Sequence, residues 1–334
     1  MWREIGYFYQ VYLEGSFSKA AEKLYLTQPA LSIAIQKLEA AAGMPLFDRS
    51  TRPLTLTPAG EIYVDTIKKA MCLEQELKQQ LEDKRQLKSG NIRIGGSHYL
   101  NAYILPEIIK SFSEKYPLIH LELLEHSSAQ LSRMLVEREL DITFNCNPKF
   151  LMDFDRYAAF DDQILLAVPK SYPVNQTHIG AAMCAADIRS GAYLSPSCPI
   201  VSLQDFRELE FILLTKNNNL YDRSHALFDM AGFEPKIKLE LSQLVTAYHL
   251  ADHGLAATFV SDRLVTAQED NLNYYKLDSE LIVRHFYILL PKRSYTSFAI
   301  RAFITHFQEC MKQGGDIKVG GILSFDRSGE SQID

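Results

Sequence analysis

The chain has 334 residues, of which 47% are hydrophobic and 23% are charged, and its formal net charge is −6. This length can build two or three hydrophobic cores, so we expect a soluble protein of several domains. No segment predicts a membrane span, and the first residues lack the basic region and apolar core of a signal peptide, which argues for a cytoplasmic protein rather than an exported one.

Three helices are predicted at the N-terminus. The first ends at Gly15 and carries apolar residues at helical spacing: Ile5, Phe8, Tyr9 and Tyr12. Ser18 is predicted to cap a short second helix that contains Ala20, Ala21 and Leu24. Thr27 is predicted to cap the third helix, with Gln28 and Pro29 in its first turn.

The third helix has two different faces and ends at Gly43. One face is an apolar stripe of Ala30, Leu31, Ile35 and Leu38. The other face is polar and can reach base edges or phosphates through Gln28, Ser32 and Gln36. This pattern predicts the recognition helix of a helix-turn-helix.

A hairpin is predicted after this helix, with strands over residues 45–49 and 54–56. Arg49 and Arg52 lie on or beside its tip, where a guanidinium fork suits phosphate oxygens or the minor groove. Thr57 and Pro58 then begin another helix, as a cap and a first-turn proline.

One stretch of this sequence resembles the winged helix-turn-helix of the LysR-type transcriptional regulators. It covers residues 15–60 and reads GSFSKAAEKLYLTQPALSIAIQKLEAAAGMPLFDRSTRPLTLTPAG. The resemblance covers nearly the whole chain. It implies a mainly α winged helix-turn-helix, a long linker helix and an α/β two-lobed sensor domain like a periplasmic binding protein. It implies a sequence-specific regulator controlled by a small-molecule effector. The partners that the resemblance implies are double-stranded DNA, the effector and further copies in a homodimer or homotetramer, with RNA polymerase as an additional partner.

The predicted DNA-binding residues are Ser18, Thr27, Gln28, Pro29, Ser32, Gln36, Arg49 and Arg52. The chain departs from the family at Ile33 and Ala34, where many members have a basic or polar residue. Residues 1–60 have a net charge of only +1, so DNA attraction must depend on local placement and dimerisation. The alternative is a small helical domain whose polar face is merely solvated.

The predicted domains are 1–58 for DNA binding, 59–89 for the linker and dimerisation helix, 90–313 for the effector domain and 314–334 for a partly disordered tail. The linker helix is predicted to run to about residue 88 without an internal glycine. Its apolar seam, suited to a partner helix, consists of Ile67, Ala70, Leu77 and Leu81. The alternative is a helix packed on its own domain.

Alternating strands and helices are predicted from residue 90, which indicates parallel sheets with helices on their faces. Lobe I is predicted as 90–161 and 264–313, with strands at 91–95, 119–124, 142–145, 272–276 and 284–290. Lobe II is predicted as 162–263, with strands at 164–168, 211–214, 237–241 and 256–260. We expect the chain to cross between the lobes near Asp161 and near Arg263. Residues 171–199 are interpreted as an insertion or a loosened part of lobe II.

Ligands bind at the carboxyl ends of such strands. The predicted effector-binding residues, which also match the family's effector pockets, are Ser97, His98, Asn145, Asn147, Thr215, Lys216 and Asn217. Helix-start amides and small hydroxyls favour an anionic or polar metabolite. No arginine is predicted in this pocket, which makes a carboxylate only weakly favoured. The alternative is that these residues cap helices and turns.

No cofactor or metal is predicted. His249 and His253 are one helical turn apart but have no evident third ligand. The five cysteines are an odd number without a close pair, which predicts neither a disulfide framework nor a zinc site. Two other classes stay open: a two-lobed solute-binding protein without DNA function, which needs an export signal, and an enzyme, which needs a catalytic set that the sequence does not show.

Overall fold

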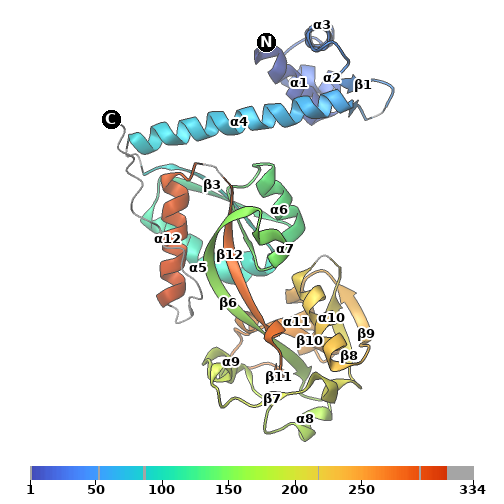
Figure 1. Cartoon of the computed structure of the whole chain (residues 1–334), viewed down its shortest axis with the longest axis vertical. Coiled ribbons are helices and arrows are strands. Elements are labelled where there is room, and N and C mark those ends of the chain that lie inside the picture. The colour runs from blue at the N-terminus through green and yellow to red at the C-terminus, as the bar shows by residue number, and fades with distance from the viewer. Residues whose placement is uncertain (1, 52, 86–87, 217, 293–294, 314–334) are drawn as a thin grey trace. The chain divides into compact units, whose positions relative to one another are not determined.

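The computed structural model describes residues 2–51, 53–85, 88–216, 218–292 and 295–313. Arg52, Asn217 and the predicted tail 314–334 lie outside the described residues. The chain forms two compact units, Met1–Leu81 and Glu82–Asp334. Figure 1 shows the elements of both. Among the helices that the structure describes, we find none with the length and apolarity to cross a bilayer.

The N-terminal unit begins with α1 (Trp2–Glu14), α2 (Phe17–Lys23) and α3 (Gln28–Ala42). A hairpin of β1 (Phe47–Asp48) and β2 (Thr55–Leu56) follows, and then the long helix α4 (Pro58–Lys84). Side chains from α1, α3 and the hairpin close one core around Phe8, Val11, Leu31, Ile35 and Leu46. The predicted helix-turn-helix and hairpin are therefore present. The hairpin strands are shorter than predicted, since Phe47 pairs with Leu56 and Asp48 with Thr55.

Three helix caps in this unit agree with the sequence and one does not. Thr57 caps α4, since its Oγ1 accepts from the Gly60 N–H at 3.1 Å. Thr27 Oγ1 accepts from the Ala30 N–H at 3.4 Å, and Gly43 ends α3 with a positive φ of 74°. Ser18 was predicted to cap α2, but Ser16 does so, because its backbone is extended and its Oγ accepts from the Lys19 N–H at 3.5 Å. Ser18 lies exposed inside the helix.

The first lobe of the C-terminal unit is built on a sheet in the order β4-β3-β5-β12-β6. Its parallel strands are β3 (Gly90–Gly96), β4 (Ile119–Glu125) and β5 (Ile142–Asn145), and the antiparallel strand β12 (Val283–Pro291) lies beside them. The helices of this lobe are α5 (Leu105–Lys115), with a π-helical turn Leu100–Ile104 before it, α6 (Ser128–Val136), α7 (Pro148–Leu151) and α12 (Phe298–Gln313).

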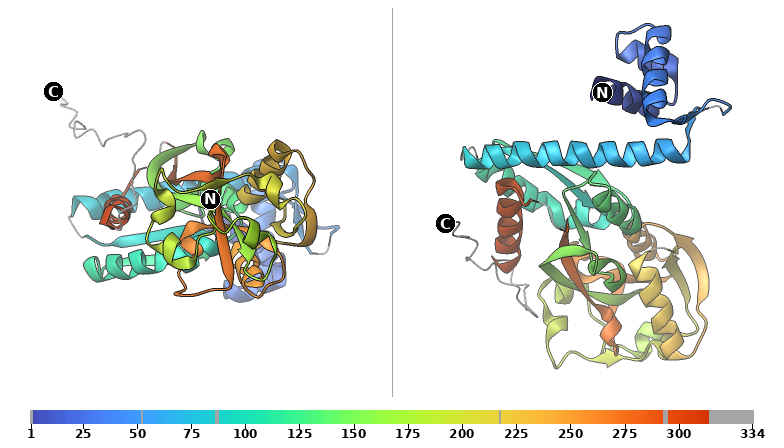
Figure 2. Two further views of the ribbon diagram at one scale, coloured as in Figure 1. Left: turned by 90° about the horizontal axis from the view of Figure 1, so that it is seen from below. Right: turned by 45° about the horizontal axis from the view of Figure 1, so that its top comes forward.

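One strand, β6 (Phe154–Pro169), belongs to both lobes. Its first half pairs with β12, and its second half pairs with β10 (Ala257–Ser261). The second lobe continues through β8 (Glu210–Leu214) and β9 (Lys236–Leu241), with α10 (Asn219–Ala231) and α11 (Leu244–Asp252). Figure 2 shows these lobes from two further directions. The predicted crossing near Asp161 thus lies inside a continuous strand.

The predicted return to the first lobe near Arg263 is wrong. The strand β11 (Leu272–Leu277) pairs antiparallel with residues 166–169 of β6 and parallel with β7 (Ile200–Val201), so it stays in the second lobe. The chain returns only at Val283, which pairs with Gln163 at the start of β12. The physical reason is that Tyr274 and Tyr275 are fully buried against the second lobe, and this burial outweighs any local preference.

Residues 171–199 are a packed part of the second lobe, not a loosened insertion. They contain α8 (Val174–Thr177) and α9 (Ala185–Arg189), and Met183 forms a β-bridge with Tyr274. Ile188 and Tyr193 are buried in the main core. Short 3-10 turns complete the unit at Ala192–Leu194, Leu203–Phe206, Asp262–Leu264 and Glu280–Ile282.

Candidate DNA-binding surface and effector cavity

The recognition helix α3 buries one face and exposes the other. Leu31, Ile35 and Leu38 are in the core. Gln28, Pro29 and Gln36 are exposed, and Ser32 is half-buried. Ala30 is exposed, so it is not part of the buried stripe as predicted. The polar face predicted to read DNA is thus accessible.

The wing is anchored to α3 by Glu39. Its Oε1 accepts from the backbone N–H groups of Leu46 and Phe47 at 2.9 and 3.3 Å, and its Oε2 accepts from Arg49 Nη2 at 2.9 Å. The Arg49 guanidinium also lies 5.3 Å from the centroid of the Phe17 ring. Arg49 remains exposed at this position, so it can reach a phosphate while its stem is held.

Tyr25 is a further exposed residue of the N-terminal unit. Its side chain is 97% exposed, and its backbone has a positive φ of 54° in the turn between α2 and α3. The left-handed region is unfavourable for a residue with a Cβ, and a fully exposed ring gains no burial in return.

A cavity of about 240 Å³ lies between the lobes. The first lobe contributes residues 97–100, 125–128 and 144–146, the second contributes 218–219 and 242–244, and β12 contributes Arg284 and Phe286. These segments follow the carboxyl ends of β3, β4, β5, β8 and β9, as expected for parallel sheets. The wall includes the starts of α6, α10 and α11, whose first amides point away from their own helices.

Three of the predicted effector residues line this cavity: Ser97, His98 and Asn145. Asn147, Thr215 and Lys216 are not in the lining formed by the described residues. Asn147 caps α7 by accepting from the Lys149 N–H at 3.1 Å, and the Thr215 N–H donates to Leu241 O at 2.9 Å. The reason is that the start of α10, rather than the end of β8, reaches the cavity.

The cavity wall also contains residues that the sequence did not single out. Asn218 and Asn219 begin α10, and Ser127 caps α6 by accepting from the Gln130 N–H at 3.4 Å. His98 Nδ1 lies 3.2 Å from Glu125 Oε2 at the same wall. A cap residue followed by an apolar helix is the sequence signal for such positions, but it does not tell which helix starts share one cavity.

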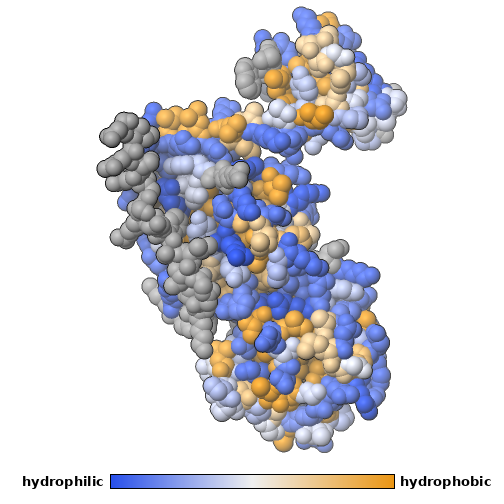
Figure 3. Space-filling view, in the orientation of Figure 1, coloured by the Kyte–Doolittle hydropathy of each residue, from blue (hydrophilic) through white to orange (hydrophobic). Residues whose placement is uncertain are grey.

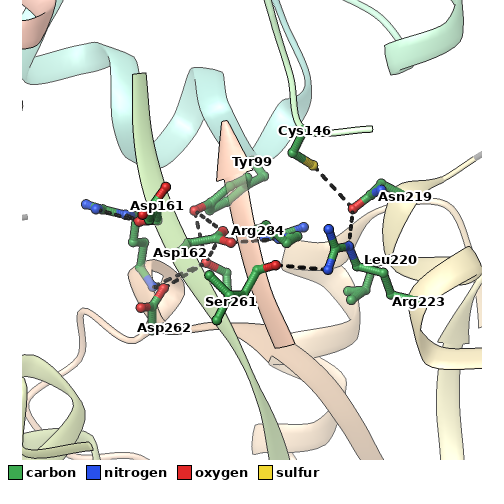
Figure 4. Close-up of polar contacts among 12 residues, drawn as sticks. Tyr99, Cys146, Asp161, Asp162, Asn219, Leu220, Arg223, Ser261, Asp262 and Arg284 are labelled. Carbon is green, nitrogen blue, oxygen red and sulfur yellow. Dashed lines mark hydrogen bonds and ion pairs between the residues drawn. The ribbon is translucent and has the colours of Figure 1, made fainter. Parts of the chain in front are cut away.

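Arg284 corrects the expectation that the pocket has no arginine. Its guanidinium lines the cavity and forms a bidentate pair with Asp162, with Nε 2.7 Å from Oδ1 and Nη2 bonded to Oδ2. Figure 4 shows this pair beside Tyr99 and Ser261. Burial alone would lower the pKa of Arg284, but the Asp162 carboxylate outweighs burial and raises it. The Arg284 guanidinium thus stays charged beside its carboxylate partner.

The hydroxyls of Tyr99 and Ser261 complete the shell of Asp162. Both donate to Oδ2, at 3.1 and 2.8 Å. Burial, followed by the nearby Asp162 charge, raises the pKa of Tyr99 well above its ordinary value, which keeps this hydroxyl a donor. The buried carboxylate therefore receives hydrogen bonds from both lobes and from β12.

A second polar chain joins the lobes at the cavity wall. The Cys146 thiol of the first lobe donates to Asn219 Oδ1 of the second lobe at 3.2 Å. Arg223 Nε donates to the same oxygen at 3.1 Å, and Arg223 Nη1 donates to Val283 O at 2.9 Å. Burial raises the pKa of Cys146 to about 11, so this thiol is protonated and unreactive near neutral pH.

Family models match both units. The bacterial regulatory helix-turn-helix protein of the lysR family matches residues 2–61, and the LysR substrate binding domain matches residues 85–312. A probable RuBisCO transcriptional regulator from Gracilaria tenuistipitata var. liui is 28% identical, covering 87% of this chain and 90% of the relative. An uncharacterized HTH-type transcriptional regulator, YcgK from Bacillus subtilis, is 27% identical over 90% of this chain and 92% of its own.

Solved structures share the fold. Full-length CbnR complexed with its target DNA superposes with a TM-score of 0.61 at 18% identity, covering 92% of this chain and 99% of that chain. A single-substitution variant of full-length OxyR from Pseudomonas aeruginosa gives a TM-score of 0.66 at 19% identity, covering 95% and 98%. With a helix-turn-helix and a two-lobed effector-binding domain matched over almost its full length, the chain belongs to the LysR family of DNA-binding transcriptional regulators.

Proposed function

We propose that this regulator reads a partly two-fold DNA site as a homodimer and that a small polar effector in the interlobe cavity controls it. The observation that supports this proposal is the cavity itself. It is bounded by helix starts and short hydroxyl or amide side chains from two lobes that are joined by β6 and by the segment that leads into β12. Two lobes joined in this way can close on a ligand.

We propose the DNA contacts along α3 and the wing. Gln28, Ser32 and Gln36 read base edges or phosphates, while Thr27 and Pro29 place the helix start against the backbone. Ser18, Arg49 and Arg52 bind phosphate. Full-length CbnR, a solved neighbour, is complexed with target DNA, which supports the DNA-binding role of this architecture.

We propose that α4 forms the dimer. Its apolar side chains Ile62, Met71, Leu73, Leu77 and Leu81 are all more than half exposed. Figure 3 shows apolar surface along this helix. Leu77 and Leu81 are one turn apart, which suits a partner helix. Among the predicted seam, only Ile67 is instead buried in the N-terminal core.

We propose domain limits of 1–58, 59–89 and 90–313, with the second lobe extended from residue 162 to about 282. The extension follows from the pairing of β11 with β6 and β7. Effector binding then shifts the population between lobe arrangements, and the linker helices convey the shift to the DNA. A tenfold preference of the effector for one arrangement corresponds to about 1.4 kcal/mol.

The effector is proposed to contact Ser97, His98 and Asn145 from the first lobe and the starts of α10 and α11 from the second. Because Arg284 is already neutralised by Asp162, backbone amides and hydroxyls supply most of the recognition. A solute-binding protein without DNA function is not favoured, because it has no use for the matched helix-turn-helix.

The test is to select fragments of genomic DNA from the source organism with the purified full-length protein at near-physiological salt. We expect a few strongly enriched fragments that share a two-fold motif. A Gln28→Ala, Gln36→Ala double variant is the control and should lose the enrichment while it keeps its folded circular dichroism. Equal recovery of random fragments by the unsubstituted protein would contradict the proposal.

A further inference from the structure

We infer that Asp83, in the last turn of α4, is the coupling residue that conveys the state of the interlobe cavity to the linker helix. The inference rests on the proposed effector control. It concerns the C-terminal unit, which begins at Glu82 and therefore contains this turn of the helix. Four observations support it: the contacts of the Asp83 side chain, the distance along the sequence between Asp83 and α12, the charge of Asp83 at the start of α12, and the packing of α12.

One carboxylate oxygen of Asp83 accepts three hydrogen bonds from the start of α12 and the residues before it. The Tyr295 hydroxyl and the Phe298 backbone N–H each donate to Oδ2 at 2.7 Å, and Arg301 Nη2 donates at 3.3 Å. The Asp83 side chain is only 13% exposed. Hydrogen bonds to an ionised acceptor are stronger than neutral ones, so this contact is the firm attachment of the helix end.

The start of α12 does not need Asp83 as its cap. Ser297 lies directly before the helix, and its Oγ accepts from the Ile300 N–H at 3.4 Å while its carbonyl accepts from the Arg301 N–H at 3.0 Å. Asp83 lies 215 residues before Phe298 in the sequence. Because α12 already has a local cap, the contribution of Asp83 is to connect α12 to α4.

The electrostatics favour a permanent contact. A carboxylate at a helix N-terminus is stabilised by the helix dipole. Burial and then the hydrogen bond to Asp83 raise the pKa of Tyr295, which keeps its hydroxyl a donor.

The helix that Asp83 holds is packed against the cavity wall. The ring centroid of Phe307 in α12 lies 5.2 Å from the ring centroid of Phe144, which lines the cavity. It lies 6.4 Å from the ring centroid of Phe160 in β6. Phe160 stacks on Phe286, another cavity residue, with centroids 4.7 Å apart and an interplanar angle of 11°. Close-packed aromatic rings move together rather than absorb a displacement.

A hydrogen bond from a side chain to the backbone reinforces this packing. Gln308 Nε2 of α12 donates to Ala158 O of β6 at 2.9 Å, and β6 continues into the second lobe. A rearrangement at Phe144 or Phe286 therefore displaces α12, and Asp83 passes the displacement to α4. A contiguous set of contacts couples the cavity to α4 only if loss of one of these contacts abolishes the coupling. The following experiment measures whether it does.

The experiment uses a filled cavity instead of an unidentified ligand. Ser242 lines the second-lobe wall, and Ser242→Trp places a bulky ring in the cavity. Affinity for the most enriched genomic fragment is measured for the full-length protein with and without Ser242→Trp. The pair is then repeated in an Asp83→Asn background, and in a Glu82→Gln background as the control with the same charge change on the neighbouring residue. Thermal unfolding verifies that every variant folds.

We expect Ser242→Trp to change the Kd for DNA at least fivefold in the natural and Glu82→Gln backgrounds but less than twofold in the Asp83→Asn background. An equal change in the Asp83→Asn background would overturn the coupling role and leave effector control intact. No change in the natural background would overturn effector control from the cavity, and the coupling role with it.

Discussion

The guanidinium of Arg284, at the start of β12, donates hydrogen bonds to both carboxylate oxygens of Asp162, which lies where β6 passes from one lobe to the other. The exposed fractions of the two side chains are only 5% and 0%. A buried ion pair of this kind is weak evidence for stability, yet loss of one partner leaves an uncompensated charge. Replacement of only one of these two residues is therefore expected to destabilise the folded protein at the junction of the lobes.

Arg284→Met is expected to lower the free energy of unfolding by about 3–5 kcal/mol, because it leaves the Asp162 carboxylate buried without its cation. Urea unfolding followed by circular dichroism measures the loss. The double variant Arg284→Met, Asp162→Asn should be more stable than the single one, since the buried charge is gone. A single variant within about 1 kcal/mol of the unsubstituted protein would show that Tyr99 and Ser261 alone satisfy Asp162.

Asp262 is expected to make the protein less stable as the pH rises through 6. Burial, followed by the charge of Asp162, raises the pKa of Asp262 from its ordinary 3.8 to about 6. Between these values the folded protein keeps a proton that the unfolded chain releases. The stabilising contribution is thus complete below about pH 4 and is lost as the pH rises through 6.

Asp262→Asn tests this pH dependence because it removes the titrating group. At pH 7.5 the variant should be more stable than the unsubstituted protein, by on the order of 2 kcal/mol. That advantage should shrink toward zero as the pH falls to 4. Urea unfolding across this range measures the difference, and a difference that does not vary with pH would contradict the assignment.

Gln28→Ala and Arg52→Ala are expected to have different effects on DNA binding. Gln28 is exposed in the first turn of α3, so its loss should reduce discrimination between specific and random DNA by about 1–3 kcal/mol. Arg52→Ala should weaken binding to all sequences and reduce the salt slope by about 1. Fluorescence anisotropy at several salt concentrations separates these outcomes. Equal loss on both DNAs for Gln28→Ala would exclude base reading.

Tyr25→Asn is expected to stabilise the N-terminal unit by about 1 kcal/mol, because asparagine tolerates the left-handed backbone better than tyrosine does. Tyr25→Ala is the matched control, since it removes the same exposed ring but keeps the unfavourable backbone. Thermal unfolding of the two variants compares them. No gain for asparagine over alanine would indicate that the turn relaxes.

Leu77→Asp is expected to dissociate the dimer proposed for α4. Leu77 is 58% exposed, so the substitution should leave the folded chain intact while it places a charge in the helix seam. Sedimentation equilibrium should show at least a tenfold weaker self-association. Lys78→Asp is the control on the adjacent position, and an equal effect there would point to charge repulsion rather than a lost apolar contact.

Much of the N-terminal unit follows from the sequence because its signals are local. Thr27 caps α3, Gly43 ends it, and Leu31, Ile35 and Leu38 repeat on one face of the helix. Each signal acts within four residues, so no distant partner is needed to interpret it. The same is true of most strands in the C-terminal unit. The cap of α2 was misplaced by two residues because Ser16 and Ser18 have the same chemistry and differ only in backbone conformation.

The candidate site depended on contacts that no local pattern contains. Asn218 and Asn219 line the cavity, although Thr215 and Lys216 were expected there. The start of α10, and not the end of β8, reaches the cavity. Arg284 entered the cavity wall through its pairing with Asp162, 122 residues earlier in the chain. The strand β11 joined the second lobe because its tyrosines are buried there. The sequence by itself thus determined the family and the helices of the N-terminal unit, α3 among them, since these depend on neighbours along the chain. Only the tertiary structure decided the cavity wall, the lobe crossing and the attachment of Asp83, because burial and long-range pairing control them.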